Sequence, residues 1–147
     1  MREAVVHEAL SRSKFEREVA FLTPLFLKSR GWIVNEAVFP VLDITFSGTR
    51  SLRLKLDCAE WDELPPAAVL LDGLGQPLQP PIPGGIFHGG PHSRKAGPFI
   101  CMRGFREYHT HDSHLHDVWS TYRGEDGNGL IGLLDQVSRT WRRTYPQ

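Results

Sequence analysis

The chain has 147 residues, 17 basic (Lys+Arg) against 17 acidic (Asp+Glu) side chains, and two cysteines. This length is typical of one domain with its own hydrophobic core, and two cysteines are too few for a disulfide framework, so we expect a single domain over residues 1–147 whose cysteines remain thiols. Because the formal net charge is zero, neither nucleic acid nor an anionic membrane is predicted as a partner.

The first predicted element is a helix that begins near Lys14. Ser13 starts a Ser-x-x-Glu capping box. Apolar residues then recur at helical spacing, at Phe15, Val19, Leu22 and Phe26. Pro24 is expected to kink this helix or to begin a second one capped by Thr23, and Gly31 is expected to end it.

Four β-strands are predicted next, as an antiparallel meander. Stretches rich in β-forming residues cover 32–39, 41–46, 52–56 and 67–71. In the third stretch, leucines alternate with charged residues from Leu52 to Asp57. This alternation predicts one buried face and one exposed face.

A long surface loop is expected over residues 73–98. It contains seven glycines and six prolines, which are poorly tolerated inside helices and strands. Its apolar residues are expected to cover the sheet or to dock a partner; they are Leu74, Leu78, Ile82, Ile86 and Phe87. A short apolar strand over residues 99–102 is predicted to follow.

The last predicted element is a helix capped by Asn128. Its apolar face consists of Leu130, Leu133, Leu134, Val137 and Trp141. The order of N-terminal helix, four-stranded antiparallel meander, long Pro/Gly loop and C-terminal helix predicts an α+β fold. No apolar run approaches the ~20 residues that cross a bilayer, and the start, MREAVVHEAL, does not have the order of a signal peptide. We therefore expect a cytoplasmic protein without a membrane partner.

Reactive side chains are concentrated in residues 98–119, PFICMRGFREYHTHDSHLHDVW. This segment contains Cys101, Glu107 and four of the seven histidines. Cys101 is predicted to be a nucleophile, because a thiol attacks as its thiolate and nearby positive charge favours that form. The cationic neighbours in sequence are Arg103, Arg106, His109 and His111. Cys58 stands among acidic residues and is expected to be a small core residue.

The same segment supports a metal-binding alternative. Cys101, Glu107, His109 and His111 all carry groups that bind zinc, and two histidines at a spacing of two share one face of an extended chain. His114 and His116 are not expected to be ligands. A solvated histidine-rich loop is the remaining interpretation.

Several motifs resemble those of the ubiquitin-conjugating enzyme superfamily, and the resemblance covers most of the chain. WDELPP (61–66) is similar to the Tyr-Pro-x-x-Pro-Pro motif of that family in its proline pair, and FHGGPHSRKAGPFIC (87–101) is similar to His-Pro-Asn followed by Gly-x-Ile-Cys. Trp119-Ser120 is similar to the Trp-Ser that follows the active-site segment of the family. The resemblance implies a ubiquitin-conjugating-enzyme-like fold. It also implies that Cys101 accepts a ubiquitin-like protein as a thioester from a ubiquitin-activating-like enzyme and passes it to an amine of a target protein, with no cofactor.

The set of Cys101, Glu107, His109 and His111 is also similar to a bacterial group found beside ubiquitin-like proteins and their activating enzymes. That group was once described as a predicted metal-binding domain, which implies a zinc-binding protein or adaptor of the same pathway without thioester chemistry. A third resemblance is to the zinc isopeptidases that remove ubiquitin, through His109-Thr110-His111 and Ser120. Arg123 stands where an aspartate ligand of those enzymes is expected.

The chain departs from the conjugating enzymes at the asparagine of His-Pro-Asn, which is missing. An oxyanion donor, or a base for the incoming amine, would therefore have to come from a histidine. The candidates are His88, His92, His109 and His111. We favour His109 and His111, with Glu107 orienting an imidazole and raising its basicity.

Overall fold

The computed structural model describes residues 2–147, with side chains described from residue 7 onward. The first half contains α1 (Arg2–Val19), α2 (Pro24–Arg30), β1 (Trp32–Val38), β2 (Val41–Phe46), β3 (Leu52–Asp57) and β4 (Ala67–Leu71). The second half contains β5 (Phe87–His88), β6 (Phe99–Ile100), α3 (Arg106–His109), the 3₁₀ turns η1 (Asp112–His114) and η2 (Trp119–Thr121), and α4 (Leu130–Thr144). The fold is α+β, as predicted.

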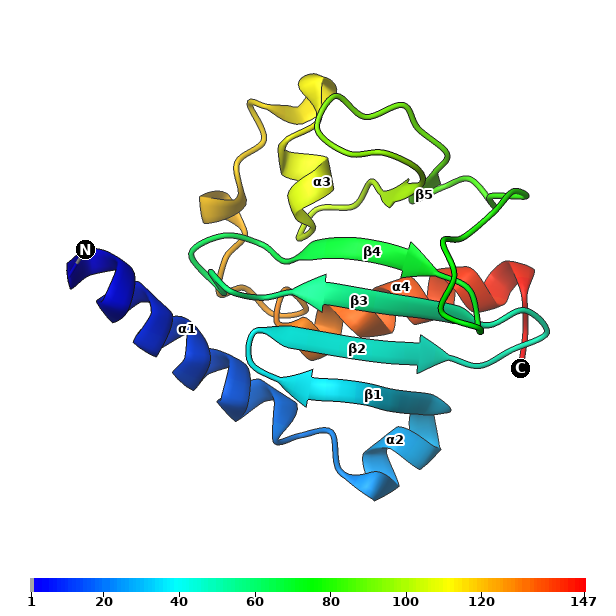
Figure 1. Cartoon of the computed structure of the whole chain (residues 1–147), viewed down its shortest axis with the longest axis horizontal. Helices are drawn as coiled ribbons and strands as arrows, with labels where there is room; N and C mark the ends of the chain where they lie inside the picture. Colours follow the sequence, from blue (N-terminus) through cyan, green and yellow to red (C-terminus); the bar gives the residue numbers. More distant parts are fainter. Residues whose placement is uncertain (1) are drawn as a thin grey trace.

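Strands β1 to β4 form one antiparallel sheet in sequence order, and β5 and β6 form a separate antiparallel pair. Helix α4 lies across one face of the sheet, and α1 extends past one end of it (Figure 1). Helix α3 and strand β6 contact β4, so the reactive segment lies at the β4 edge of the sheet.

The core forms between α4 and the inward face of the sheet. The predicted apolar face of α4 is fully buried, and so are Leu52, Leu54 and Leu56 of β3. The predictions of a buried leucine face on β3 and a buried apolar face on the C-terminal helix are therefore confirmed. Burial of these side chains supplies the main favourable free energy of folding.

Helix α1 begins at Arg2, much earlier than the predicted start near Lys14. Ser13 and Glu16 are exposed residues inside this helix, so the capping-box prediction was wrong. The same spacing of Ser and Glu fits the exposed face of a helix interior equally well. The second helix is confirmed: the Thr23 side chain accepts the Phe26 N–H at 3.2 Å, and Gly31 ends α2 at φ 67°.

The cap of α4 also differs from the prediction. Gly129, not Asn128, is the N-cap residue, and the Asn128 side chain donates to the Tyr122 carbonyl at 3.0 Å. The first free N–H of the helix, that of Leu130, is bound by the Glu18 carboxylate at 2.8 Å. An acidic group from α1 thus stabilises the N-terminus of α4.

The segment over residues 73–98 includes β5 and is packed against the core for much of its length. Leu78 is 2% exposed, whereas Leu74 is 88% exposed. Phe87 is also buried, and Ile82 and Ile86 pack against the same cluster. Most of its apolar residues therefore cover the sheet. None of the helices described over residues 2–147 is long and apolar enough to cross a membrane.

Candidate functional site

Cys101 directly follows β6. Phe99 and Ile100 of β6 pair with His88 and Phe87 of β5, and the Cys101 N–H extends the pairing by donating to the Ile86 carbonyl at 2.7 Å. Ile100 belongs to the hydrophobic core cluster, and because side chains alternate along an extended chain we expect Cys101 to point to the same side as Phe99. The Cys101 thiol is partly exposed.

The two thiols differ in accessibility. Cys58 is 1% exposed, and burial, followed by the nearby Asp57 and Glu18 carboxylates, strongly raises its pKa. Partial burial also raises the pKa of Cys101. Cys101 is therefore the thiol that a reagent or partner can reach.

The expected cationic activation of Cys101 is not what the structure describes. The Arg103 side chain binds the Asp117 carboxylate at 2.9 Å, and the Arg106 side chain donates to the Pro65 carbonyl at 3.0 Å. Both guanidinium groups hold neighbouring segments together. Proximity in sequence was a poor guide here, because both side chains have partners on other segments.

Three imidazoles surround the Phe99 ring. The ring centroid of Phe99 lies 5.0 Å from that of His88, 4.8 Å from that of His92 and 5.9 Å from that of His111. We call His88, His92 and His111 the histidine group. It gathers around Phe99, which is the cross-strand partner of His88 and lies two residues before Cys101 in the sequence.

Each member of the histidine group accepts a backbone N–H through Nδ1, from the residue two positions later. The donors are Gly90 for His88, Arg94 for His92 and Ser113 for His111. In the neutral ring the proton is therefore on Nε2, which makes that atom a hydrogen-bond donor. His92 uses it on the Glu107 carbonyl at 2.8 Å, whereas Nε2 of His88 and Nε2 of His111 have no hydrogen-bond partner among the residues described.

His109 is placed differently. Its Nε2 accepts the Gly104 N–H at 3.0 Å and its Nδ1 donates to the Asp117 carbonyl at 2.7 Å. Burial lowers the pKa of His109, in keeping with a neutral ring. Both nitrogens are thus occupied within the loop that follows Cys101.

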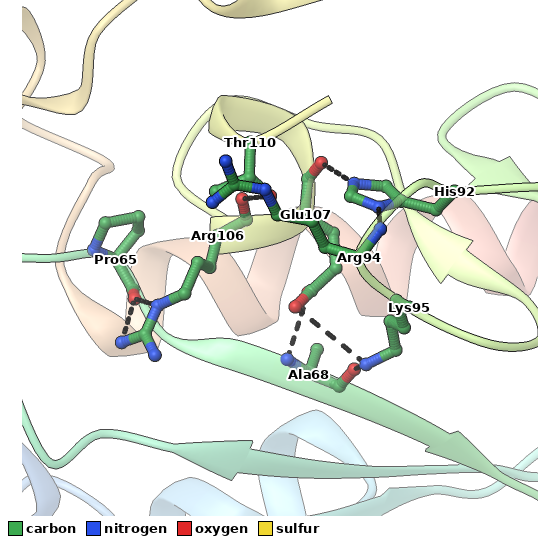
Figure 2. Close-up of polar contacts among 8 residues, drawn as sticks. All are labelled: Pro65, Ala68, His92, Arg94, Lys95, Arg106, Glu107 and Thr110. Carbon is green, nitrogen blue, oxygen red and sulfur yellow. Dashed lines mark hydrogen bonds and ion pairs between the residues drawn. The ribbon is translucent and has the colours of Figure 1, made fainter. Parts of the chain in front are cut away.

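Glu107 is buried, with 6% exposure. Its carboxylate accepts the Ala68 N–H at 3.0 Å and lies 3.8 Å from the Lys95 ammonium (Figure 2). Burial raises the pKa of Glu107 despite the opposing effect of Lys95. The expectation that this carboxylate orients an imidazole differs from the structure, in which the contact of Glu107 with His92 is made by its backbone carbonyl.

Two of the proposed zinc ligands Cys101, Glu107, His109 and His111 have other partners: both ring nitrogens of His109 are hydrogen-bonded within the loop, and the Glu107 carboxylate binds the Ala68 N–H and faces Lys95. Across the described chain, no group of three or more His, Cys, Asp or Glu side chains is placed to hold one. For the isopeptidase resemblance, the Arg123 side chain pairs with Asp62 at 3.1 Å and supplies no ligand.

Asp117 is a central residue of this region that the sequence analysis missed. Its carboxylate accepts hydrogen bonds from Arg103 at 2.9 Å, from Tyr108 at 2.6 Å and from Tyr122. These bonds hold the pKa of Asp117 well below its usual range. An aspartate among histidines has no diagnostic spacing, so nothing in the sequence distinguishes Asp117 from Asp112.

Two of the motif segments lie against each other. The Trp119 indole N–H donates to the Asp62 carbonyl at 2.7 Å, and the Trp61 and Trp119 rings are 6.0 Å apart. The segment after Cys101 is thereby fastened to the WDELPP segment before β4.

Comparison with known proteins gives a local similarity. The family model described as Y4jH-like, of the Y4jH family, matches residues 90–142. The uncharacterized protein y4jH of Sinorhizobium fredii (strain NBRC 101917 / NGR234) is 42% identical over 40 residues, which cover 27% of this chain and 20% of that protein. This chain thus spans about a fifth of the length of the curated relative that it matches. The match to the family model includes Cys101 and α4 as far as Arg142, while β1 to β4 lie outside it.

Proposed function

We propose that this protein is a ubiquitin-conjugating-like enzyme that carries a ubiquitin-like protein as a thioester on Cys101. The observation that carries the proposal is the position of this thiol: it is partly exposed, directly after a short strand at the β4 edge of an α+β fold. The other cysteine is buried. The order of helix, four-stranded meander, cysteine segment, tryptophan and helix supports the same assignment.

The chemistry consists of two acyl transfers. The Cys101 thiolate attacks the carbonyl carbon of a thioester on an activating enzyme; a new C–S bond forms, the old C–S bond breaks, and the thiolate of the activating enzyme leaves. An amine of the target then attacks the Cys101 thioester. A C–N bond forms, the C–S bond breaks, Cys101 leaves as thiolate, and the amine releases a proton.

The raised pKa of Cys101 suits a carrier of an acyl group. Burial reduces the thiolate fraction, but a more basic thiolate is more nucleophilic and a poorer leaving group. Such a thiol would hold its acyl group until a well-placed amine attacks.

Each transfer also develops an oxyanion that needs hydrogen-bond donors. Among the histidines considered, His88 and His111 fit this role best, because each has an Nε2–H without a partner among the described residues. His92 and His109 have both ring nitrogens occupied.

The experiment is to incubate the protein with a ubiquitin-like protein, its activating enzyme and ATP, and to follow the intact mass. We expect an adduct that a thiol reductant removes. Cys58→Ala should still form it and Cys101→Ala should not, while Cys101→Ser should give a reductant-resistant ester or no adduct. Equal adduct formation by the wild type and Cys101→Ala would contradict the proposal. Elemental analysis of the same preparations tests the zinc alternative, which requires stoichiometric metal that is lost on replacing Cys101 or His109.

A further inference from the structure

Lys95 and Glu107 lie on the two chain segments that flank Cys101. Lys95 belongs to the loop before β6, and Glu107 belongs to α3, which follows the cysteine. Both side chains reach one residue of β4. Oε1 of Glu107 accepts the Ala68 N–H at 3.0 Å, and Nζ of Lys95 donates to the Ala68 carbonyl (Figure 2).

The two segments are also joined directly to each other. Nζ of Lys95 lies 3.8 Å from Oε2 of Glu107. His92 donates from Nε2 to the Glu107 carbonyl at 2.8 Å and packs its ring edge against Phe99. Strand β6 and Cys101 therefore lie between two segments that are attached to β4 at the same point.

We infer that Lys95 and Glu107 are positioning residues for Cys101: by attaching both flanking segments to Ala68, their ion pair sets how far the thiol is exposed. The biological meaning of this role rests on the proposed thioester function. The effect on the exposure of the thiol does not rest on that function, because a small alkylating reagent measures this exposure without any partner protein.

The ion pair acts as a unit because its carboxylate is buried. A carboxylate that is only 6% exposed cannot keep its charge at low cost once its ammonium partner is removed. Loss of Lys95 therefore forces Glu107 either to take up a proton or to move toward water. Movement would draw α3 away from β4 and open one side of the site around Cys101.

Opening the site has a defined effect on the thiol. Partial burial raises the pKa of Cys101, so greater exposure lowers it toward its ordinary value. Each unit by which the pKa falls gives up to about tenfold more thiolate near neutral pH. The variants should therefore react faster with iodoacetamide at Cys101, and the pH profile of that reaction should move to lower pH.

The test uses the full chain and measures alkylation of the Cys101 peptide by mass spectrometry over a pH series. Lys95→Met and Glu107→Gln should each raise the neutral-pH rate, by up to about tenfold, and the double variant should resemble the single ones. Arg94→Met is the matched control, because it removes the same charge from an exposed neighbour of Lys95; it should react like the wild type. Lys95→Arg should restore most of the wild-type behaviour.

The inference is wrong if the Lys95 and Glu107 variants lose thermal stability while the rate and pH profile of Cys101 alkylation stay unchanged. If Lys95→Met does not fold, Glu107→Gln decides the question, because it removes the ion pair with Lys95 while keeping the size of the side chain. The two proposals fail separately. A wild type that never forms a thioester, combined with faster alkylation in the variants, would contradict the enzymatic function and leave the positioning role in place.

Discussion

His109 is bonded to Asp117 across the loop that follows Cys101: its Nδ1 donates to the Asp117 carbonyl at 2.7 Å. Its Nε2 accepts the Gly104 N–H from the beginning of the same loop. A ring with both nitrogens engaged in this way cannot take a proton from an amine without breaking one of these bonds. His109 therefore differs in its hydrogen bonding from His111, although both histidines were predicted from the sequence to have the same role.

We first predict that His109→Ala mainly lowers stability. The change removes both hydrogen bonds and leaves a backbone N–H and a carbonyl without their partner, which typically costs about 1–3 kcal/mol of unfolding free energy. Urea unfolding measures this loss. His116→Ala, which changes an exposed histidine of the same segment, should have little effect. An unchanged unfolding free energy in His109→Ala would argue against the structural role.

The second prediction concerns His111. If its Nε2–H donates to the oxyanion, His111→Ala should slow discharge of the Cys101 thioester by roughly 10²-fold. His111→Gln, whose side-chain amide can place an N–H near the same point, should recover part of the rate. Single-turnover discharge to a free amine provides the measurement, with unfolding free energy as the check on folding. A discharge rate for His111→Ala equal to that of the wild type would remove His111 from the mechanism.

The third prediction concerns acid stability and Asp117. Its folded pKa lies below the ordinary value of 3.8 because Tyr108, Tyr122 and Arg103 bind the carboxylate. The folded state therefore binds this proton less readily than the unfolded state, so the stabilisation is complete above pH 3.8 and is lost as the pH falls toward the folded pKa. Asp117→Asn should be less stable at neutral pH and should lose less stability on acidification. Urea midpoints measured over a pH series test this, and parallel curves for the two proteins would contradict it.

The fourth prediction concerns the segment over residues 73–98. Leu78 is buried and Leu74 is exposed, so they form a matched pair on one segment. Leu78→Ala should cost about 2–5 kcal/mol of unfolding free energy. Leu74→Ala should stay within about 0.5 kcal/mol of the wild type. Similar unfolding curves for both variants would show that the packing of this segment contributes little to stability.

The sheet and α4 could be predicted from the sequence because the determining signals are local. Alternating leucines specify the face of β3, and a stripe of apolar residues specifies the buried face of α4. The start of α1 could not be predicted in this way. Its N-terminal residues are ordinary helix formers without an apolar stripe, and the Ser-x-x-Glu pattern at Ser13 is compatible with a helix interior as well as with a helix start.

The site was only partly predictable, because its hydrogen bonds join residues that are far apart in sequence. Cys101 could be singled out by residue type and motif. The partners of Glu107 could not be predicted from the sequence, since Ala68 contributes only backbone groups and Lys95 has no distinctive spacing from the glutamate. Glu18 at the N-terminus of α4 is a similar case: a cap from another helix replaced the local one expected at Asn128.

The attachment of Lys95 and Glu107 to Ala68 has a consequence for self-association. The two outer strands of the sheet are β1 and β4, and an outer strand with free backbone groups can pair with a strand of another molecule. At Ala68 both backbone groups are already bonded to charged side chains, and farther along β4 the Leu70 carbonyl accepts the Leu78 N–H. These bonds leave β4 with fewer free backbone groups for pairing with a strand of another molecule. The other edge is β1, where the irregular register between Val34 and Glu36 interrupts the regular row of backbone groups that such pairing needs.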